Sequence, residues 1–243
     1  MLKIESPHNE TFKKLLSLTE SRGLKKEGLF LLSGEKLIAE FLRQPHLPVA
    51  HEVVTMGMAA LTKDTAKMIE FSAGLFSELD VLGTHFNILV LEQPPIQTVD
   101  VKSCAPHGIE VVLPVGDPGN LGALLRSCEA FGVPKVILTK EAAHPFLPKA
   151  VKASAGSALR VPLARGPALA EFPENSIALD MDGTPIGQFT WPADGFLIVG
   201  EEGPGFSKPF KQRICIPTQA VQSLNVVVAA SIALAQRAAG KQS

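Results

Sequence analysis

The sequence has 243 residues, of which 46% are hydrophobic and 19% charged, and its formal net charge is −1. This length allows one large domain or two modest ones, and the balanced charge excludes a protein coated throughout with positive charge. Widely spaced cysteines, the lack of a signal-peptide pattern and apolar runs too short to span a bilayer predict a cytoplasmic protein without disulfides, zinc or a membrane anchor.

The first part of the chain alternates helix and strand signals. Asn9 is a residue type that caps helices, and the helix after it would turn one stripe inward, namely Phe12, Leu15, Leu16 and Thr19. Residues 29–32 predict a short buried strand, residues 35–43 a second helix, and residues 51–55 another strand. Together they predict a small α/β sandwich of about ninety residues, a usual size for a domain.

Basic residues are concentrated near the N-terminus. They are Lys13, Lys14, Arg22, Lys25, Lys26, Lys36 and Arg43. Acidic residues are interleaved with them, so the pattern fits either a solvated helix face or a local surface that contacts phosphate groups. The sequence leaves both interpretations open.

A proline-containing stretch predicts the boundary between two parts of the chain. Residues 86–91 resemble a strand, and Pro94 and Pro95 follow directly, which disfavours helix and removes backbone donors. A second break lies at residues 105–108. We therefore predict a first domain at residues 1–97, a linker at 98–108 and a second domain at 109–243.

The second part has a more regular pattern. Its apolar strand candidates are residues 109–115, 135–138, 176–179, 196–199 and 213–216, and its helix candidates are residues 121–131 and 149–159. Continuous apolar strands that alternate with helices are typical of a parallel sheet covered on both faces. Ligands in such sheets bind at the carboxyl ends of the strands, so the loops that follow the strands are the expected place of a functional site.

The first such loop begins at Gly116 and leads into a helix. Asp117 and Asn120 are residue types that cap helices, and nearby glycines permit close approach of the backbone to a ligand. Arg126 falls outside the apolar stripe of this helix, so it can project toward a bound anion. An ordinary capped helix with a solvated arginine explains the same pattern.

The second loop follows the strand candidate at residues 196–199 and contains three glycines and two carboxylates, from Gly200 to Gly205. Such a loop suits backbone contacts with a small molecule. Its glycine order is not GxGxxG followed by a helix, so a Rossmann dinucleotide site is not supported. A plain turn is the alternative.

The third loop leads from Ile216 and Pro217 into a final helix. Ser223 can cap this helix, which is apolar nearly all round and must be buried inside the domain or against another subunit. Asn225 would lie in its first turn among apolar neighbours. A buried amide needs partners, so Asn225 is either a structural hydrogen-bonding residue or a site residue.

Taken in order, the three loops resemble the signature motifs of the SpoU-type methyltransferases of the SPOUT superfamily. The matching stretches are DPGNLGALLRSCEAFGV, IVGEEGPGFS and IPTQAVQSLNVVVAASIAL, and the intervening VKASAGSALRVPL is also similar. This resemblance covers essentially all of residues 109–238. A looser likeness, including FLLSGEKLIAEFL, relates the first part to the ribosomal-protein-like RNA-binding domain that many members carry.

The resemblance implies a parallel-sheet domain with a deep trefoil knot, preceded by a small α/β/α sandwich, and a homodimer formed through the knotted domain. It implies S-adenosylmethionine as the cofactor and methyl transfer to a ribose 2′-hydroxyl of RNA, with ribosomal RNA favoured over transfer RNA. No metal is expected, because the adjacent carboxylates Glu201 and Glu202 seldom converge on one atom and the six histidines show no ligand spacing. The implied cofactor-binding residues are Gly200, Gly205, Ile216, Pro217 and Leu224. The implied active-site residues are Asn120, Arg126, Glu202, Ser223 and Asn225.

Two interpretations of Arg126 follow from the resemblance. The family proposal makes this arginine the proton acceptor, but a free guanidinium has a pKa of about 12.5 or more. Arginine is also the natural bidentate ligand of phosphate. We therefore favour a clamp on the phosphate beside the target ribose, with a phosphate oxygen, water or another side chain as the acceptor of the proton.

Two departures from the family pattern keep other functions open. Ala220 replaces a usual glycine and Val227 a usual small polar residue, both near the expected cofactor loop. They leave room for a non-catalytic RNA-binding or ribosome-assembly protein on the same fold. A phosphate-binding metabolic α/β enzyme is the third possibility.

Overall fold

The computed structural model describes residues 2–200, 206 and 208–240, and the chain forms two compact units. The first unit comprises Met1–Pro95 and His144–Gly156, and the second comprises Ile96–Ala143 and Ser157–Ser243. This division differs from the predicted domains at 1–97 and 109–243 with their linker at 98–108. Whether those predicted boundaries separate independently folding parts stays a prediction.

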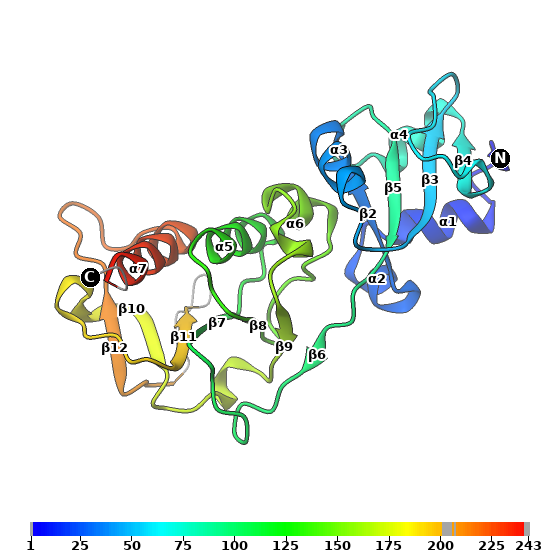
Figure 1. The fold of residues 1–243 in the computed structure, drawn as a ribbon. Coiled ribbons are helices and arrows are strands. Elements are labelled where there is room, and N and C mark those ends of the chain that lie inside the picture. Colours follow the sequence, from blue (N-terminus) through cyan, green and yellow to red (C-terminus); the bar gives the residue numbers. More distant parts are fainter. Residues whose placement is uncertain (1, 201–205, 207, 241–243) are drawn as a thin grey trace. The chain divides into compact units, whose positions relative to one another are not determined.

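The first unit is built on a five-stranded sheet in the order β1-β4-β3-β5-β2 (Figure 1). Neighbours β1, β4 and β3 are parallel, whereas β5 is antiparallel to both β3 and β2. The strands are β1 (Leu2–Ile4), β2 (Leu29–Ser33), β3 (Val49–Thr55), β4 (Met68–Phe71) and β5 (Ile88–Glu92). The helices are α1 (Glu10–Ser17), α2 (Ser21–Glu27), α3 (Glu35–Arg43), α4 (Ala73–Leu79) and α6 (Pro148–Ala153), with the 3-10 turn η1 (Thr65–Lys67).

The predicted elements of this unit are confirmed, with small shifts at their ends. The Asn9 side chain accepts hydrogen bonds from the backbone N–H groups of Thr11 and Phe12, so it caps α1 as expected. Helix α1 ends at Ser17, so Thr19 lies beyond it. Helix α3 spans the predicted residues and buries Ile38 and Phe41.

Several of the N-terminal basic residues are paired. Lys13 Nζ lies 2.8 Å from Glu10, and Lys14 and Lys26 both lie close to Glu27, at 3.3 and 3.1 Å. Such exposed pairs stabilise little, but they partly neutralise the cluster. Their presence favours the interpretation of a solvated helix face for these three lysines.

A fully buried carboxylate holds the loop that follows β3. Glu52 Oε1 accepts hydrogen bonds from Leu61 N (2.7 Å) and Asn87 Nδ2 (2.6 Å), and Oε2 accepts from Thr62 N (2.9 Å) and Thr62 Oγ1 (2.6 Å). Burial alone would raise the pKa of Glu52, but these donors together outweigh it and lower the pKa below its ordinary value. The ionised carboxylate is therefore part of the folded structure.

The second unit is built on a seven-stranded sheet in the order β12-β10-β11-β7-β8-β9-β6, in which every neighbouring pair is parallel. The strands are β6 (Gln97–Thr98), β7 (Ile109–Leu113), β8 (Val136–Leu138), β9 (Leu163–Arg165), β10 (Ile177–Pro185), β11 (Gly195–Val199) and β12 (Gln212–Cys215). The helices are α5 (Pro118–Ala130) and α7 (Val226–Gly240), with the 3-10 turns η2 (Ser157–Leu159), η3 (Leu169–Glu171) and η4 (Ile186–Gln188). The predicted parallel sheet is confirmed.

Successive strand residues enter two separate hydrophobic clusters, one on each face of this sheet. In β7, Val111 and Leu113 pack in the cluster that α5 and α7 cover, whereas Val112 packs in the other. The second cluster is closed by Leu169 of η3 and by phenylalanines, including Phe172. Burial on both faces explains why these strands are continuous apolar runs.

One prediction for residues 109–243 was wrong, and two strands of the sheet were not predicted. The single helix expected at residues 149–159 is divided into α6 and η2, because the backbone turns left-handed at Ala155 (φ 48°) and Gly156 (φ 83°). The short strands β6 and β9 were missed, since neither carries a long apolar run. Within the described part of the chain, every helix falls short of the length and apolar character that crossing a membrane requires.

Replacing Glu52 with Gln is expected to destabilise the first unit. Each carboxylate oxygen of Glu52 accepts two hydrogen bonds, and a glutamine would put an NH₂ group in the place of one of these oxygens, facing two donors. Hydrogen bonds to charged groups contribute about 1.5–3 kcal/mol each to stability. Because the pKa of Glu52 is lowered in the folded state, its stabilisation should be present at neutral pH and lost as the pH falls below 4.5. Urea unfolding of the full chain, followed by circular dichroism at several pH values, measures both effects.

Glu92→Gln is the matched control, because Glu92 is exposed at the end of β5. It should leave the unfolding midpoint unchanged. Equal midpoints for the Glu52 and Glu92 variants at neutral pH would contradict the role given to Glu52.

Candidate functional site

The carboxyl ends of β11 and β12 meet at one edge of the second unit, beside the place where the regular pairing of β10 is interrupted after Leu179. Leu179 of β10 is paired with Val199 of β11 and with Ile214 of β12. The residues that follow, Asp180 among them, therefore leave the sheet at the same level. This is the edge at which parallel α/β sheets bind ligands.

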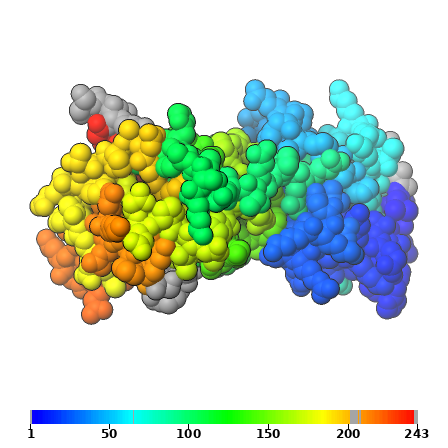
Figure 2. Space-filling model, turned by 90° about the horizontal axis from the view of Figure 1, so that it is seen from below, coloured from blue at the N-terminus to red at the C-terminus, as the bar shows by residue number. Residues whose placement is uncertain are grey.

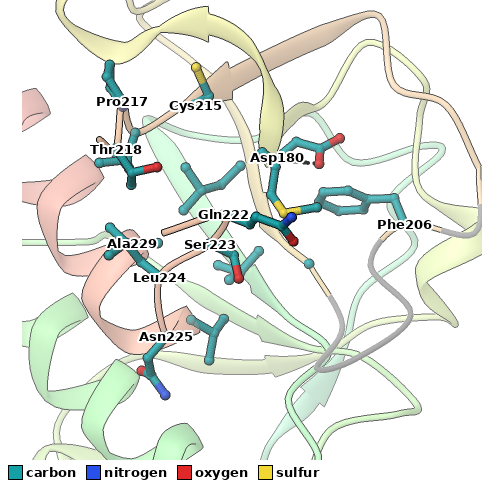
Figure 3. Close-up of a pocket in the computed structure, with 16 residues that line it drawn as sticks. Asp180, Phe206, Cys215, Pro217, Thr218, Gln222, Ser223, Leu224, Asn225 and Ala229 are labelled. Atoms are coloured by element: carbon teal, nitrogen blue, oxygen red, sulfur yellow. Dashed lines mark hydrogen bonds between the residues drawn. The ribbon is translucent and has the colours of Figure 1, made fainter. Parts of the chain in front are cut away.

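A cavity of about 580 Å³ lies at this edge (Figure 3). Its apolar lining includes Leu179, Met181, Val199, Phe206, Ile216, Pro217, Leu224, Val226 and Ala229. Its polar lining includes Asp180, Thr218, Gln222, Ser223 and Asn225. The volume and the mixed lining are typical of sites for cofactors and other small molecules.

The two later sequence motifs converge on this cavity. The predicted site residues that line it are Gly200, Ile216, Pro217, Ser223, Leu224 and Asn225. The segment that carries the last four lies at the surface, coloured orange in the space-filling view (Figure 2). Glu202 and Gly205, which we also predicted, lie outside the described residues.

Asn120 and Arg126 do not line the cavity but belong to α5, which packs directly on α7. Ser127 Oγ of α5 lies 2.7 Å from Ser231 Oγ of α7. The backbone N–H of Asn120 donates to Asp117, the N-cap of α5. Arg126 is exposed, as its position outside the apolar stripe predicted.

The start of α7 corrects the prediction for Ser223 and Asn225. Asn225, not Ser223, caps the helix: its Oδ1 accepts from Val227 N (2.8 Å) and its backbone carbonyl accepts from Ala229 N (3.0 Å). Asn225 thus precedes the first turn and is exposed, because the helix begins two residues later than a Ser223 cap would allow. Since Oδ1 is the acceptor in the cap, Nδ2 remains available as a donor.

Sequence reasoning missed part of the lining, above all Asp180 and Met181. Both follow directly after the strand predicted at residues 176–179, so the rule that directed attention to the other strand ends would have found them. In Figure 3, Asp180 and Phe206 lie on one side of the cavity and Pro217 and Thr218 on the other. Thr218 Oγ1 donates to Val221 O (2.7 Å), which closes a turn in this loop.

The second unit contains the buried thiol of Cys128 and the half-buried thiol of Cys215. Cys128 is buried in α5, and burial raises the pKa of its thiol to about 12, so it stays protonated. Cys215 lines the cavity and donates to Gly183 O (3.3 Å). Among the residues that the structure describes, no three His, Cys, Asp or Glu side chains are grouped so that they could hold a metal ion.

One curated relative, from Bacillus subtilis strain 168, is similar to this chain over both of its parts. It is the 23S rRNA (guanosine(2553)-2′-O)-methyltransferase RlmP, 27% identical over 96% of this chain and 97% of that protein. A second, from Syntrophobacter fumaroxidans, is named ribosomal RNA small subunit methyltransferase G 2 and is 38% identical over 96% of this chain. The chain spans only 48% of that protein's length, so the name does not say what the matched half does.

Comparison of folds and of family sequence patterns agrees with these relatives. The structure of the SpoU methyltransferase AviRb from Streptomyces viridochromogenes, in complex with AdoMet, matches with a TM-score of 0.77 over 96% of this chain and 99% of that one, at 22% identity. This likeness shows the fold. The sequence pattern of the SpoU rRNA Methylase family matches residues 109–235, which include all three loops and the whole lining of the cavity. The chain therefore belongs to the SpoU rRNA Methylase family.

Proposed function

We propose that this protein transfers a methyl group from S-adenosylmethionine to a ribose 2′-hydroxyl of structured RNA, with ribosomal RNA favoured over transfer RNA. The observation that carries the proposal is the cavity at the ends of β10, β11 and β12, which two of the three family motifs line. The relative from Bacillus subtilis, named as a 23S rRNA 2′-O-methyltransferase, supports the choice of acceptor. Such an acceptor would place the protein in the cytoplasm.

The residues around the cavity fit S-adenosylmethionine. The apolar side chains suit an adenine ring, and the backbone at Gly200, Ile216 and Leu224 would hold the adenosine, with Pro217 beside it. Gly205, which lies outside the described residues, is expected to complete this set. When bound, the sulfonium supplies a methyl group that is already activated toward attack by a hydroxyl oxygen.

The chain's own contribution is to position the acceptor and to move a proton. Arg126, exposed on α5, clamps the phosphate beside the target ribose through bidentate hydrogen bonds. Asn225 helps to position the acceptor by donating a hydrogen bond from Nδ2, since its Oδ1 already accepts the hydrogen bond that caps α7. Asn120, Glu202 and Ser223 order the loops and the ribose, and positioning of this kind supplies much of the barrier reduction in group transfer.

The alternative of a non-catalytic protein rested on Ala220 and Val227. Among the described residues that line the cavity, neither occurs. Val227 packs against the hydrophobic cluster under α7, and Ala220 is exposed. Both substitutions therefore lie outside the surface that would contact the cofactor, which favours the enzyme.

Calorimetry with S-adenosylmethionine and transfer of a labelled methyl group to RNA test the proposal together. We expect one cofactor bound per chain and label incorporated into ribosomal RNA at a 2′-oxygen, found by mapping the modified nucleotide. Absence of cofactor binding would support the non-catalytic protein. Label found on a base instead of a ribose would refute the stated reaction.

Arg126→Lys separates the two roles considered for this arginine. A lysine keeps the charge but loses the bidentate geometry, so for a clamp we expect KM for RNA to rise about tenfold while kcat stays near normal. Steady-state methylation assays at fixed saturating cofactor measure both constants. Arg160→Lys, whose arginine pairs with Glu129 at 2.6 Å, is the control and should change neither.

A change in kcat instead of KM would contradict the clamp. A kcat reduced more than about a hundredfold with KM unchanged would mean that the guanidinium acts in the transition state, as a proton acceptor must.

The final helix supports the homodimer that the family resemblance implied. Val228 and Ile232 lie four residues apart on α7 and are 47% and 38% exposed, and Val221 in the preceding loop is 56% exposed. Apolar side chains at helical spacing on an exposed face are typical of subunit contacts. The trefoil threading of the segment before α7 belongs to the same proposal.

The double variant Val228→Glu and Ile232→Glu is expected to be a monomer, because charge would be buried without a partner in the interface. Sedimentation velocity of the variant and of the unchanged protein at equal concentration measures this. Val81→Glu, at a valine 54% exposed in the first unit, is the control and should remain a dimer. A monomeric unchanged protein would overturn the proposed dimer without affecting the proposed chemistry.

A further inference from the structure

Strand β10 leaves the sheet for four residues beside the cavity and then returns to it. Leu179 and Thr184 are both paired with Ile214 of β12, so residues 180–183 form an excursion between them. Gly183 makes this possible, because a Cβ there would lie 2.6 Å from the carbonyl of Arg213. The interruption of the pairing at residues 180–183 therefore depends on the glycine at position 183, and its first residue, Asp180, lines the cavity.

Asp180 is the one charged residue among the described residues that line the cavity. Its side chain is 25% exposed, and its Oδ1 accepts from Met181 N at 2.7 Å. Oδ2 lies 3.5 Å from Arg213 Nη1, at the outer limit of a hydrogen bond. A carboxylate has about four acceptor positions, so these two contacts leave capacity for a ligand.

The register of the sheet places Asp180 between the two segments assigned to the adenosine. Leu179 is paired with both Val199 and Ile214, so Asp180 directly follows the residue at which β10 lies between β11 and β12. Phe206 lies on the same side of the cavity as Asp180 (Figure 3). A carboxylate that lines the cavity would be available to the polar, sugar part of an adenosine whose base lay against the apolar lining.

We infer that Asp180 is a specificity-determining residue that accepts hydrogen bonds from the ribose hydroxyls of the cofactor. The inference rests on the proposed function and assigns a residue to one part of its cofactor. A ribose offers two neighbouring O–H donors, and an ionised carboxylate is acceptor-only, so the two groups are complementary. Carboxylates placed after a strand bind ribose hydroxyls in dinucleotide sites by the same chemistry.

Two other roles for this carboxylate make different predictions. A contact with the α-ammonium group of the cofactor would stabilise only ligands that carry that group. A purely structural pairing with Arg213 would affect the cavity as a whole, and so every ligand equally. Ligands that differ by a single group therefore distinguish the three roles.

The experiment uses calorimetry with the full-length protein and four probes: S-adenosylhomocysteine, 5′-methylthioadenosine, and the 2′-deoxy and 3′-deoxy forms of the latter. For Asp180→Ala, we expect binding of S-adenosylhomocysteine and of 5′-methylthioadenosine to weaken alike, by about tenfold to a hundredfold, as for loss of a charged hydrogen bond. A deoxy probe should bind the unchanged protein more weakly, yet lose little further affinity in the variant.

Asp182→Ala is the matched control, because Asp182 belongs to the same excursion but is exposed and does not line the cavity. It should bind all four probes as the unchanged protein does. Thermal unfolding of the free variants checks that both fold. Asp180→Asn, which keeps one oxygen acceptor, should recover part of the affinity.

Each remaining outcome has a definite meaning. Unchanged affinity in Asp180→Ala, a loss confined to S-adenosylhomocysteine, or an equal loss for the deoxy probes would each overturn the ribose assignment. Failure of the unchanged protein to bind S-adenosylmethionine or any probe would instead overturn the proposed function.

Discussion

The site depends on one constraint, the parallel pairing of β10 with β11 on one side and β12 on the other. That pairing brings segments from residues near 180, 200 and 215 to one edge at the same level. It is stable because alternate residues of β10 and β11 are buried in separate clusters on the two faces, and Ile214 of β12 is buried in one of them. A one-residue slip of any strand would exchange its two faces, so core packing also sets the position of the cavity.

The helices of the second unit connect this edge to the residues expected to contact RNA. Helix α7 begins at the cavity with Asn225 as its cap, and its Ser231 bonds to Ser127 of α5. Arg126 is the residue before Ser127, so its backbone is held by the same contact. The cavity lining and the proposed phosphate clamp thus share one packed pair of helices.

In the first unit, specific polar contacts hold a loop in place and pair several lysines with acidic side chains. The buried Glu52 carboxylate fixes the loop at Leu61 and Thr62, and acidic neighbours pair with Lys13, Lys14 and Lys26. The proposed recognition of structured RNA, by shape and by a few local contacts, agrees with a chain whose formal net charge is −1.

The sequence by itself determined five of the seven strands of the parallel sheet, the capped α1 and the exposed Arg126, because apolar runs and capping residues are local signals. The family motifs added six residues of the cavity lining. Tertiary structure alone decided the rest. Asn225 caps α7 in place of Ser223, and the division of the helix expected at residues 149–159 depends on left-handed backbone at Ala155 and Gly156. Asp180 enters the site only because two separate strands pair with β10, and pairing between segments far apart in the chain leaves no mark in any short stretch of sequence.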